Sequence, residues 1–443
     1  MLTMSNTQNP YKSGYPRGKW YMLSIPAKLN NPTVSQVFDN EAELGSYGEP
    51  NWRLFSYNDS DNNGMTDSYI EFDVNQPSSI FQFTTGKAFW LKANPEGSKI
   101  AIDVGAGYVL PLEPHTISLK AGWNQIGNPF AFPIAFFPND LSIANQLYLP
   151  DGAGGYHLTT TMLPWNGYFI YVNGNNNVEL VLTPSLSKSL QKDYVESGEW
   201  VMQIATYCCD SKDEINYLGI SEISSDNYDI KDLPEPPAIG DHISLYFPHP
   251  DWQQRCKQYT SDFRLNMKDG QVWNFEVTTN QNSPEITLNW EMIYAAQPDL
   301  KFILYDINRA QSIDMKFNNR YTFSPLNKEA PSRFKIIVGC AHFIEHQLDD
   351  VQSHIPGNFC LYQNYPNPFN ASTIIPFDIS RTSNVKLVLY NIKGEEVEVI
   401  TNKVFEPGCH EISYNATNLP SGLFFYKIEA EGFVKMKKLT ILK

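Results

Sequence analysis

The sequence has little charge and no long apolar run. Only 18% of its 443 residues are charged, and their formal sum is −15. An acidic chain is repelled by phosphate groups, so nucleic acid and anionic membranes are not expected as partners. No apolar run reaches the ~18 residues that a membrane-spanning helix needs. We therefore expect an acidic protein with no transmembrane segment.

The cysteines form neither a metal pattern nor a disulfide framework. No CxxC pair of the zinc type occurs among them. Cys208 and Cys209 are adjacent, a spacing that ordinary disulfide geometry disfavours. The pattern therefore leaves the disulfide connectivity open. The six cysteines are Cys208, Cys209, Cys256, Cys340, Cys360 and Cys409.

Catalytic signatures are missing as well. There is no GxSxG elbow, HExxH pair, P-loop or GxGxxG turn. The eight histidines are scattered and accompany no nucleophile. Paired carboxylates of the glycosidase kind leave no sequence spacing, so they stay open. We expect no catalytic residues, and hence no enzyme.

What the chain has in abundance is β-structure. Hydrophobic residues make up 42% and aromatic residues 14%, enough for several packed cores. Asn, Ser, Thr, Tyr and Pro are frequent, which favours turn-rich β-structure over helix. We predict an all-β protein of several β-sandwich domains in tandem, ending in a small C-terminal β-sandwich.

The last domain shows this pattern most clearly. Short alternating apolar segments are separated by turn formers such as Lys393-Gly394 and Pro407-Gly408. Their even spacing indicates a sandwich, because a single sheet of this size would leave one apolar face wet. The expected strands are Ile374–Ile379, Val385–Ile392, Glu396–Ile400, Cys409–Tyr414, Leu423–Glu429 and Lys435–Leu442.

Three separated motifs carry a resemblance to a known family. QNYPNPFN occupies residues 363–370, VLYNIKGEEV residues 388–397 and LPSGLFFYKI residues 419–428. With these motifs in order at its extreme C-terminus, the segment 358–443 resembles the type A C-terminal sorting domain of the type IX secretion system. It is also similar to the immunoglobulin-like domains of flagellar hook caps, and YPNPFN by itself is compatible with a rigid linker.

The resemblance implies where the protein is sent rather than which reaction it catalyses. The expected partner is the type IX secretion machinery, and the expected location is extracellular, either free or attached to the outer cell surface. Ala371, where the family usually has a second proline, and Cys409 are small departures from the pattern. The motif residues are Asn364, Pro366, Asn367, Pro368, Phe369, Asn370, Gly394, Gly408, Leu419, Pro420, Ser421, Gly422, Tyr426 and Lys443.

The beginning of the chain fits this address less well. Such a cargo requires a signal peptide, and the first residues lack the apolar core of one. We therefore expect a C-terminal piece of a longer protein or an expression fragment. Residues 1–17 read as a disordered or linker segment.

Residues 18–184 look like a weak tandem repeat, with units at about 18–105 and 118–184. The Trp-containing segment at 18–26 resembles that at 121–129, and the aromatic segment 87–94 resembles 167–174. A Trp on a strand hides its apolar face only against another layer. The pattern predicts two similar β-units packed together.

The first unit contains a near match to a calcium loop. Asp59, Asp61, Asn63 and Asp67 alternate as oxygen ligands, but Ile70 stands at the closing acidic position. A long hairpin turn between 52–57 and 68–72 explains the same residues. Calcium is thus the only cofactor that the sequence suggests, and we favour the hairpin turn over a calcium site.

The rest of the chain divides into a connector (185–198), a β-sandwich (199–340) and a linker (341–357). The linker carries His342, His346 and His354 without a second ligand cluster, so a solvated segment is expected there. An acidic, proline-rich loop at 226–237 reads as a rigid crossing between strands. A cation site at Asp226, Asp229 and Asp232 is the alternative.

Three functions fit these observations. The first is a non-catalytic adhesive or structural surface module. The second is a carbohydrate-binding accessory region of a secreted hydrolase whose catalytic domain lies upstream, and the third is a hidden hydrolase site. Tryptophans and many tyrosines suggest the second, although such residues are more often core. Surface glycans or other surface proteins would be the partners. These tryptophans are Trp20, Trp52, Trp90, Trp123, Trp165, Trp252 and Trp273.

Overall fold

The structure is a computed structural model dominated by strands. Among the described residues there are two helices, α1 (Val34–Phe38) and α2 (Ala341–Ser353), and the all-β class is confirmed. The described residues are 15–16, 18–38, 45–49, 51–57, 69–75, 79–93, 99–100, 104–185, 200–265, 269–282, 285–294, 299–325, 330–353 and 358–442.

The chain forms two compact units. The first comprises residues 1–266 and 277–296, and the second residues 267–276 and 297–443. The finer domain boundaries expected from the sequence stay predictions.

The two similar Trp-containing segments, 18–26 and 121–129, form equivalent strands in two sheets of the same strand order. In the first repeat the order is β2-β6-β4-β5, and in the second it is β10-β15-β12-β13. The strands of the first sheet are β2 (Trp20–Ser24), β4 (Trp52–Tyr57), β5 (Tyr69–Glu71) and β6 (Ala88–Ala93). Those of the second are β10 (Gly122–Gly127), β12 (Leu147–Pro150), β13 (Tyr156–Thr159) and β15 (Gly167–Val172).

Short pairs of strands accompany these sheets. In the first repeat β1 (Tyr15–Pro16) pairs with β7 (Lys99–Ile100), and β3 (Lys28–Leu29) pairs with β8 (Gly107–Tyr108). In the second repeat β9 (His115–Leu119) pairs with β16 (Val178–Leu182), and β11 (Ile134–Ala135) pairs with β14 (Thr161–Met162).

Equivalent backbone hydrogen bonds join the two repeats. The Ser24 amide donates to the Trp165 carbonyl at 3.1 Å, and the Gly127 amide donates to the Gly86 carbonyl at 2.9 Å. Gly167 permits the close approach, because a Cβ there would lie 2.5 Å from the Ala88 Cβ. The repeats are therefore related by a local two-fold arrangement.

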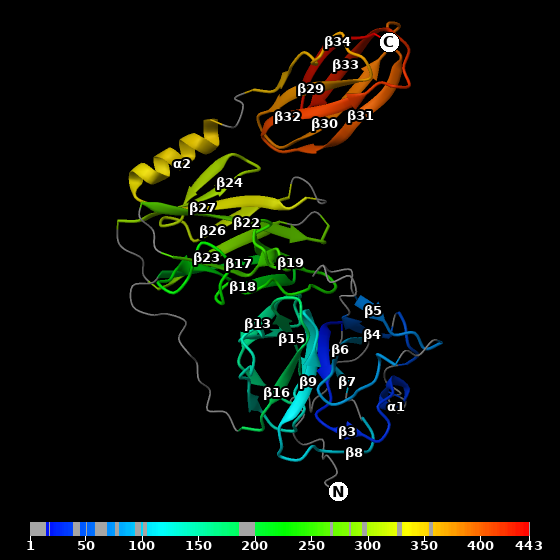
Figure 1. Cartoon of the computed structure of the whole chain (residues 1–443), viewed down its shortest axis with the longest axis vertical. Helices are drawn as coiled ribbons and strands as arrows, with labels where there is room; N and C mark the ends of the chain where they lie inside the picture. The colour runs from blue at the N-terminus through cyan, green and yellow to red at the C-terminus, as the bar shows by residue number, and fades with distance from the viewer. Residues whose placement is uncertain are drawn as a thin grey trace. The chain divides into compact units, whose positions relative to one another are not determined.

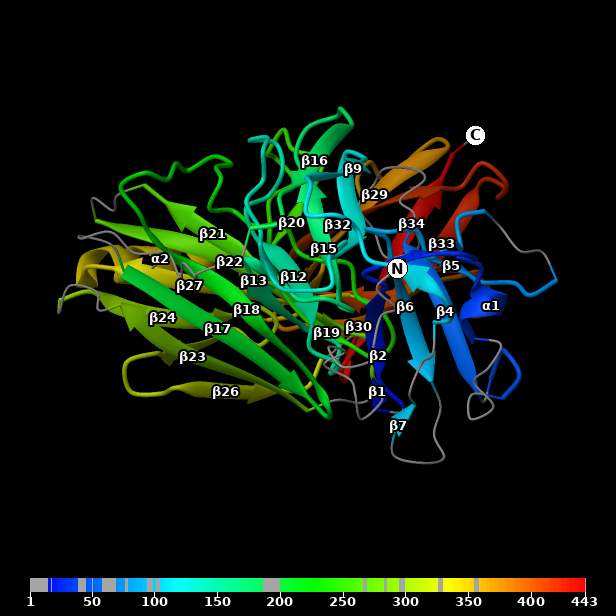
Figure 2. The same cartoon turned by 90° about the horizontal axis from the view of Figure 1, so that it is seen from below.

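Strand alternation divides the repeat side chains between separate cores. On β2 and β6, Leu23 and Phe89 enter a core built mainly from the first repeat, whereas Met22 and Trp90 enter a shared one. Tyr168 on β15 likewise enters the second repeat's own core, while its neighbour Phe169 joins the shared one. Figure 2 shows both repeats from below.

The shared core also takes side chains from the following β-region. Ile215 of β18 and Leu233 of the acidic loop pack with Trp90, Trp123 and Tyr148. In the first unit this region forms the neighbouring strands β21-β18-β17-β23 and the β19–β20 pair. Their bounds are β17 (Trp200–Cys208), β18 (Ser211–Ile220), β19 (Ile243–Pro248), β20 (Gln258–Tyr259), β21 (Ser261–Arg264) and β23 (Ile286–Tyr294).

The second unit begins with another group of strands, in which β24 lies between β25 and β27. The strands are β24 (Lys301–Asp306), β25 (Gln311–Asp314), β26 (Arg320–Phe323) and β27 (Ser332–Gly339), and β22 (Gly270–Thr279) contributes residues to both units.

Helix α2 occupies the segment that we expected to be a solvated linker. Its Ile344 is buried with Ile303, Tyr305 and Ile337, and Phe343 and Leu348 pack beside it. The spacing of these apolar side chains gives the helix one face toward the strands. His342 and His346 are exposed, and His354 lies outside the described residues.

The C-terminal segment is a two-sheet sandwich with its own core, as predicted (Figure 1). One sheet has the order β28-β29-β32 and the other β31-β30-β33-β34. Each fully buried side chain in such a core contributes about 1.5–3 kcal/mol. The strands are β28 (Cys360–Leu361), β29 (Ser372–Ile379), β30 (Ser383–Tyr390), β31 (Glu396–Phe405), β32 (Gly408–Asn415), β33 (Gly422–Ala430) and β34 (Phe433–Ile441).

Candidate functional site

The first tail motif lies along the final strand. The Phe369 amide donates to the Thr440 carbonyl at 3.1 Å, and the Leu442 amide donates to the Phe369 carbonyl at 2.9 Å. The Asn367 Oδ1 accepts the Thr440 amide at 2.9 Å. Because β34 ends its sheet, these bonds cover part of an edge that would otherwise be unpaired.

Asn364 joins the first motif to the third. It is 2% exposed, and its amide donates to the Tyr426 hydroxyl oxygen at 2.8 Å. The Tyr426 hydroxyl in turn donates to the Tyr362 carbonyl at 2.8 Å. Burial raises the pKa of Tyr426 to about 12, so this phenol keeps its proton. The Asn364 Nδ2 also donates to Thr373 and Pro366 oxygens.

The other motif residues have more local roles. Phe369 is buried in the tail core. Pro366, Pro368 and Asn370 are exposed in the same loop. Leu419, Pro420, Ser421 and Gly422 make the connection into β33, where the Leu419 amide donates to the Ala416 carbonyl.

Two tail glycines supply backbone conformations that other residues avoid. Gly394 has a φ of +80° and Gly408 a φ of +146°. Asn391 closes the turn at Gly394, since its Oδ1 accepts the Lys393 and Glu395 amides. Lys443 lies outside the described residues.

The calcium-loop residues Asp59, Asp61, Asn63 and Asp67 also lie outside the described residues. Glu71, the nearest acidic residue to the closing position, is described. Its carboxylate accepts hydrogen bonds from Arg53 at 2.7 and 2.8 Å, and the Arg53 hydrogen bond lowers its pKa. That carboxylate is therefore already paired with a cation.

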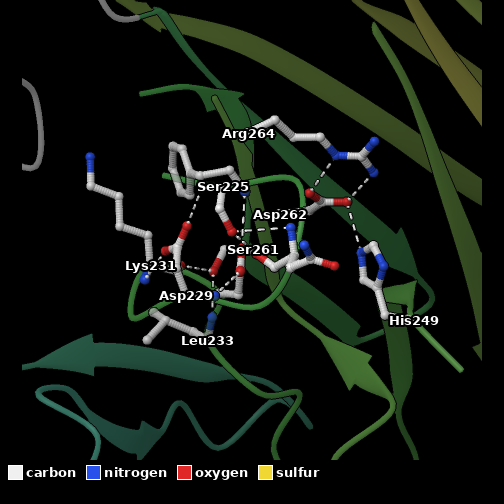
Figure 3. Close-up of polar contacts among 11 residues, drawn as sticks. Ser225, Asp229, Lys231, Leu233, His249, Ser261, Asp262 and Arg264 are labelled. Atoms are coloured by element: carbon white, nitrogen blue, oxygen red, sulfur yellow. Dashed lines mark hydrogen bonds and ion pairs between the residues drawn. The ribbon is translucent and has the colours of Figure 1, made fainter. Parts of the chain in front are cut away.

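The carboxylates of the acidic loop accept hydrogen bonds from backbone amides of the same loop and so stabilise its conformation (Figure 3). Asp229 accepts the Ser225 and Lys231 amides at 2.8 Å each. Asp232 accepts the Asp229 amide at 2.8 Å and the Phe263 amide at 3.1 Å. Burial, with the nearby Asp229 charge, raises the pKa of Asp232 to about 9. These oxygens serve backbone donors rather than a cation.

Ser261 holds the end of the loop against β21 (Figure 3). Its Oγ donates to the Lys231 carbonyl at 2.6 Å and accepts the Leu233 amide at 2.7 Å. Next to it, Asp262 is 1% exposed. Arg264 donates to both oxygens of Asp262, and His249 Nε2 lies 2.9 Å from its Oδ2.

Burial and hydrogen bonding have opposite effects on the pKa of Asp262. Burial alone would raise the pKa of this carboxyl, but the Arg264 and His249 hydrogen bonds hold it below its ordinary value. The His249 ring also stacks on Trp252, with ring centroids 3.5 Å apart. A buried ion pair such as Asp262 with Arg264 is weak evidence of added stability, because desolvation offsets much of the attraction.

Tyrosines of the repeats hold the same loop from the other side. The Tyr148 hydroxyl donates to the Pro234 carbonyl at 2.8 Å, and the Tyr156 hydroxyl donates to the Pro237 carbonyl at 2.5 Å. The Tyr228 hydroxyl of the loop donates to Asn173 Oδ1 at 2.7 Å. The loop thereby joins the repeats to the β-region that follows them.

Sequence reasoning missed the partners in both networks. Tyr362 and Thr373 lie outside the conspicuous motif letters, and Ser261, Asp262 and Arg264 belong to an ordinary strand pattern. In the described part of the chain, no three His, Cys, Asp or Glu side chains are placed to hold a metal ion.

Comparison with known proteins identifies the tail. Residues 363–442 match the family described as "Secretion system C-terminal sorting domain", a span that includes all three motifs. A search of the curated proteins finds no match to the chain. Within the described residues, no helix has the length and apolar character needed to cross a membrane. The C-terminal sandwich is therefore a type IX secretion C-terminal sorting domain, and the protein that carries it is secreted or attached to the cell surface.

Proposed function

We propose that this protein is a non-catalytic β-module protein that acts outside the cell as an adhesive or structural element. The sorting domain supplies the destination. The modules ahead of it supply a spacer and a contact surface for another component of the cell surface.

The observation that carries this proposal is the shared aromatic core of the first unit. Trp123 packs edge-on against Tyr148 and Tyr171, with ring centroids 5.0 and 5.1 Å apart. Aromatic pairs of this kind contribute about 0.5–1.5 kcal/mol each beyond their buried area. Together with the tyrosine–loop hydrogen bonds, they favour a stiff unit, which suits a spacer.

The acidic groups of the loop region support a non-catalytic role. A general acid or base must reach a proton on its substrate. Asp229, Asp232 and Asp262 instead accept hydrogen bonds from their own chain. Their arrangement supports the fold rather than a reaction.

The tryptophan part of the support for the carbohydrate-binding alternative is weakened. That alternative relies on tryptophans and tyrosines that offer a flat face to a sugar ring. All nine tryptophans lie in the described residues and none is exposed: Trp20 is half-buried and the others are buried. We therefore favour contact through loops and strand edges with another surface protein or polymer.

The test uses the whole exported chain. We expect saturable binding to intact cells of the producing strain or to their isolated surface material, with no product released from polysaccharide and peptide substrates. Turnover of any substrate would overturn the non-catalytic role. Binding to purified glycans alone would establish the alternative. As a control for the role of the sorting domain in export, a variant lacking residues 358–443 is expected to remain inside the cell.

A further inference from the structure

Two cysteine side chains meet in the turn between β17 and β18. The Cys208 and Cys209 sulfurs lie 3.8 Å apart. Cys209 has a φ of +53°, in the left-handed region that non-glycine residues seldom adopt. The turn is short, because Cys208 pairs directly with Ser211 across the hairpin.

The surroundings of the turn bury the Cys208 thiol and leave the Cys209 thiol exposed to solvent. Cys208 is 1% exposed, and its sulfur lies 3.4 Å from Gln281 Oε1. Gln281 also donates to Ser211 Oγ at 2.7 Å, which holds the turn against a neighbouring loop. Cys209 is exposed, so reagents in solution reach it.

The other described cysteines of the first unit and the tail are poorly placed for disulfides. Cys360 and Cys409 both lie opposite Asp378, on the two strands that flank β29. Two strand spacings separate them by about 9–10 Å, beyond the ~7 Å limit between Cα atoms for a disulfide. The Cys256 thiol donates to the Gln258 carbonyl at 2.8 Å.

We propose that Cys208 and Cys209 form a redox-active vicinal pair, which closes to a disulfide between adjacent residues once the protein is outside the cell. The sequence spacing argues against such a bond, because adjacent Cα atoms in a trans peptide are ~3.8 Å apart, below the usual range for disulfides. The structure brings the sulfurs together through the unusual backbone at Cys209. Secreted proteins meet oxidising conditions that allow the bond to form.

The oxidant is an external disulfide, either a small molecule or a thiol oxidoreductase. The Cys209 thiolate attacks one sulfur of that disulfide, which forms a mixed disulfide and releases the first thiol. The Cys208 thiolate then attacks the Cys209 sulfur and releases the second thiol. Two electrons and two protons leave the protein pair, and the external disulfide is reduced to two thiols.

The order of attack follows from burial. Burial raises the pKa of Cys208 to about 11, so its thiolate is scarce near neutral pH. The exposed Cys209 is therefore the first nucleophile. A disulfide strained by its short span is also easily reduced again. The pair consequently responds to the redox state of its surroundings rather than acting as a permanent crosslink.

Peptide mapping of the full chain tests the proposal directly. The tryptic peptide 193–212 contains Cys208 and Cys209 and no other cysteine. The full chain is incubated with oxidised glutathione, quenched in acid, denatured and alkylated. We expect peptide 193–212 to lack alkyl label and to be lighter than the dithiol form by two hydrogen atoms. After reduction, the same peptide takes a label on each cysteine.

Single variants provide the controls. Cys208→Ser and Cys209→Ser should each abolish the lighter species, whereas Cys256→Ser should leave it unchanged. Two observations would overturn the proposal: full alkylation of peptide 193–212 after oxidation, or its crosslinking to a peptide that contains another cysteine.

Discussion

Tyr426→Phe removes a hydroxyl that links the first and third motifs of the sorting domain. Its oxygen accepts the Asn364 amide and donates to the Tyr362 carbonyl, each at 2.8 Å. Tyr426 is fully buried and Asn364 nearly so. The variant keeps the ring in the core but leaves a buried amide without an acceptor.

The expected cost follows from that amide. A buried donor left unpaired costs about 1–3 kcal/mol, which corresponds to a roughly 5- to 150-fold change in an opening equilibrium. We expect hydrogen exchange of the Asn364 amide, and of its neighbours in the 363–370 loop, to become faster by this factor. Exchange measures the tail separately, which suits a chain of several domains that need not unfold in one step.

Tyr414→Phe is the matched control in the same sandwich. The Tyr414 side chain is also buried, but its hydroxyl donates to the Glu398 carboxylate at 2.9 Å rather than holding a backbone amide. We expect the 363–370 loop to exchange at the wild-type rate in this variant. If Tyr426→Phe leaves Asn364 exchange unchanged, or if Tyr414→Phe accelerates it equally, the hydroxyl does not hold the motifs together.

Three further predictions concern the first unit. Gly167→Ala places a Cβ 2.5 Å from the Ala88 Cβ and should lower the unfolding free energy by about 1–3 kcal/mol through overpacking; a urea midpoint equal to wild type would contradict the close approach of the repeats. Burial raises the pKa of Asp213 to about 6 in the folded protein, above the ordinary carboxyl value of ~4. The folded state therefore holds the Asp213 proton more tightly than the unfolded state. The stability that this proton contributes is complete below pH ~4, and up to ~3 kcal/mol of it is lost as the pH rises to about 6. Asp213→Asn should flatten the dependence of urea stability on pH between 4 and 6, although the buried Glu235 carboxyl acts in the same direction, and an equal slope in both proteins would refute this. Calorimetry with millimolar Ca²⁺ is expected to show no binding heat, because Ile70 replaces the closing ligand and Glu71 is paired with Arg53; a heat present in wild type and lost in Asp61→Asn would establish a calcium site.

The tail shows how far local pattern reaches. On β30, Val385, Leu387 and Leu389 are fully buried, at the alternate positions that the sequence displays. Turn residues at both ends fix where such a strand stops, so the six expected strands and the sandwich were predictable. The paired strands of the repeats were expected from the similarity of the segments 18–26 and 121–129 and of 87–94 and 167–174, not from alternation, since β15 is buried along its whole length.

Helix α2 shows where that reasoning failed. Its segment is rich in acidic and histidine side chains, which favoured a solvated linker. The helix is placed by Ile344 docking against Ile303 and Ile337, residues of strands β24 and β27. A short stretch of moderate apolarity becomes a packed helix only when a partner surface exists.

The sequence by itself determined the all-β class, the repeated strands and the sorting domain, because periodicity, turn chemistry and contiguous motifs are all local properties. Only the tertiary structure decided which face of each repeat strand joins the shared core. It also decided which amides donate hydrogen bonds to the carboxylates of the acidic loop, and that the Asn364 amide donates to the Tyr426 hydroxyl oxygen. Those outcomes depend on groups far apart in the chain, whose meeting is set by packing and by the need to pair every buried polar group.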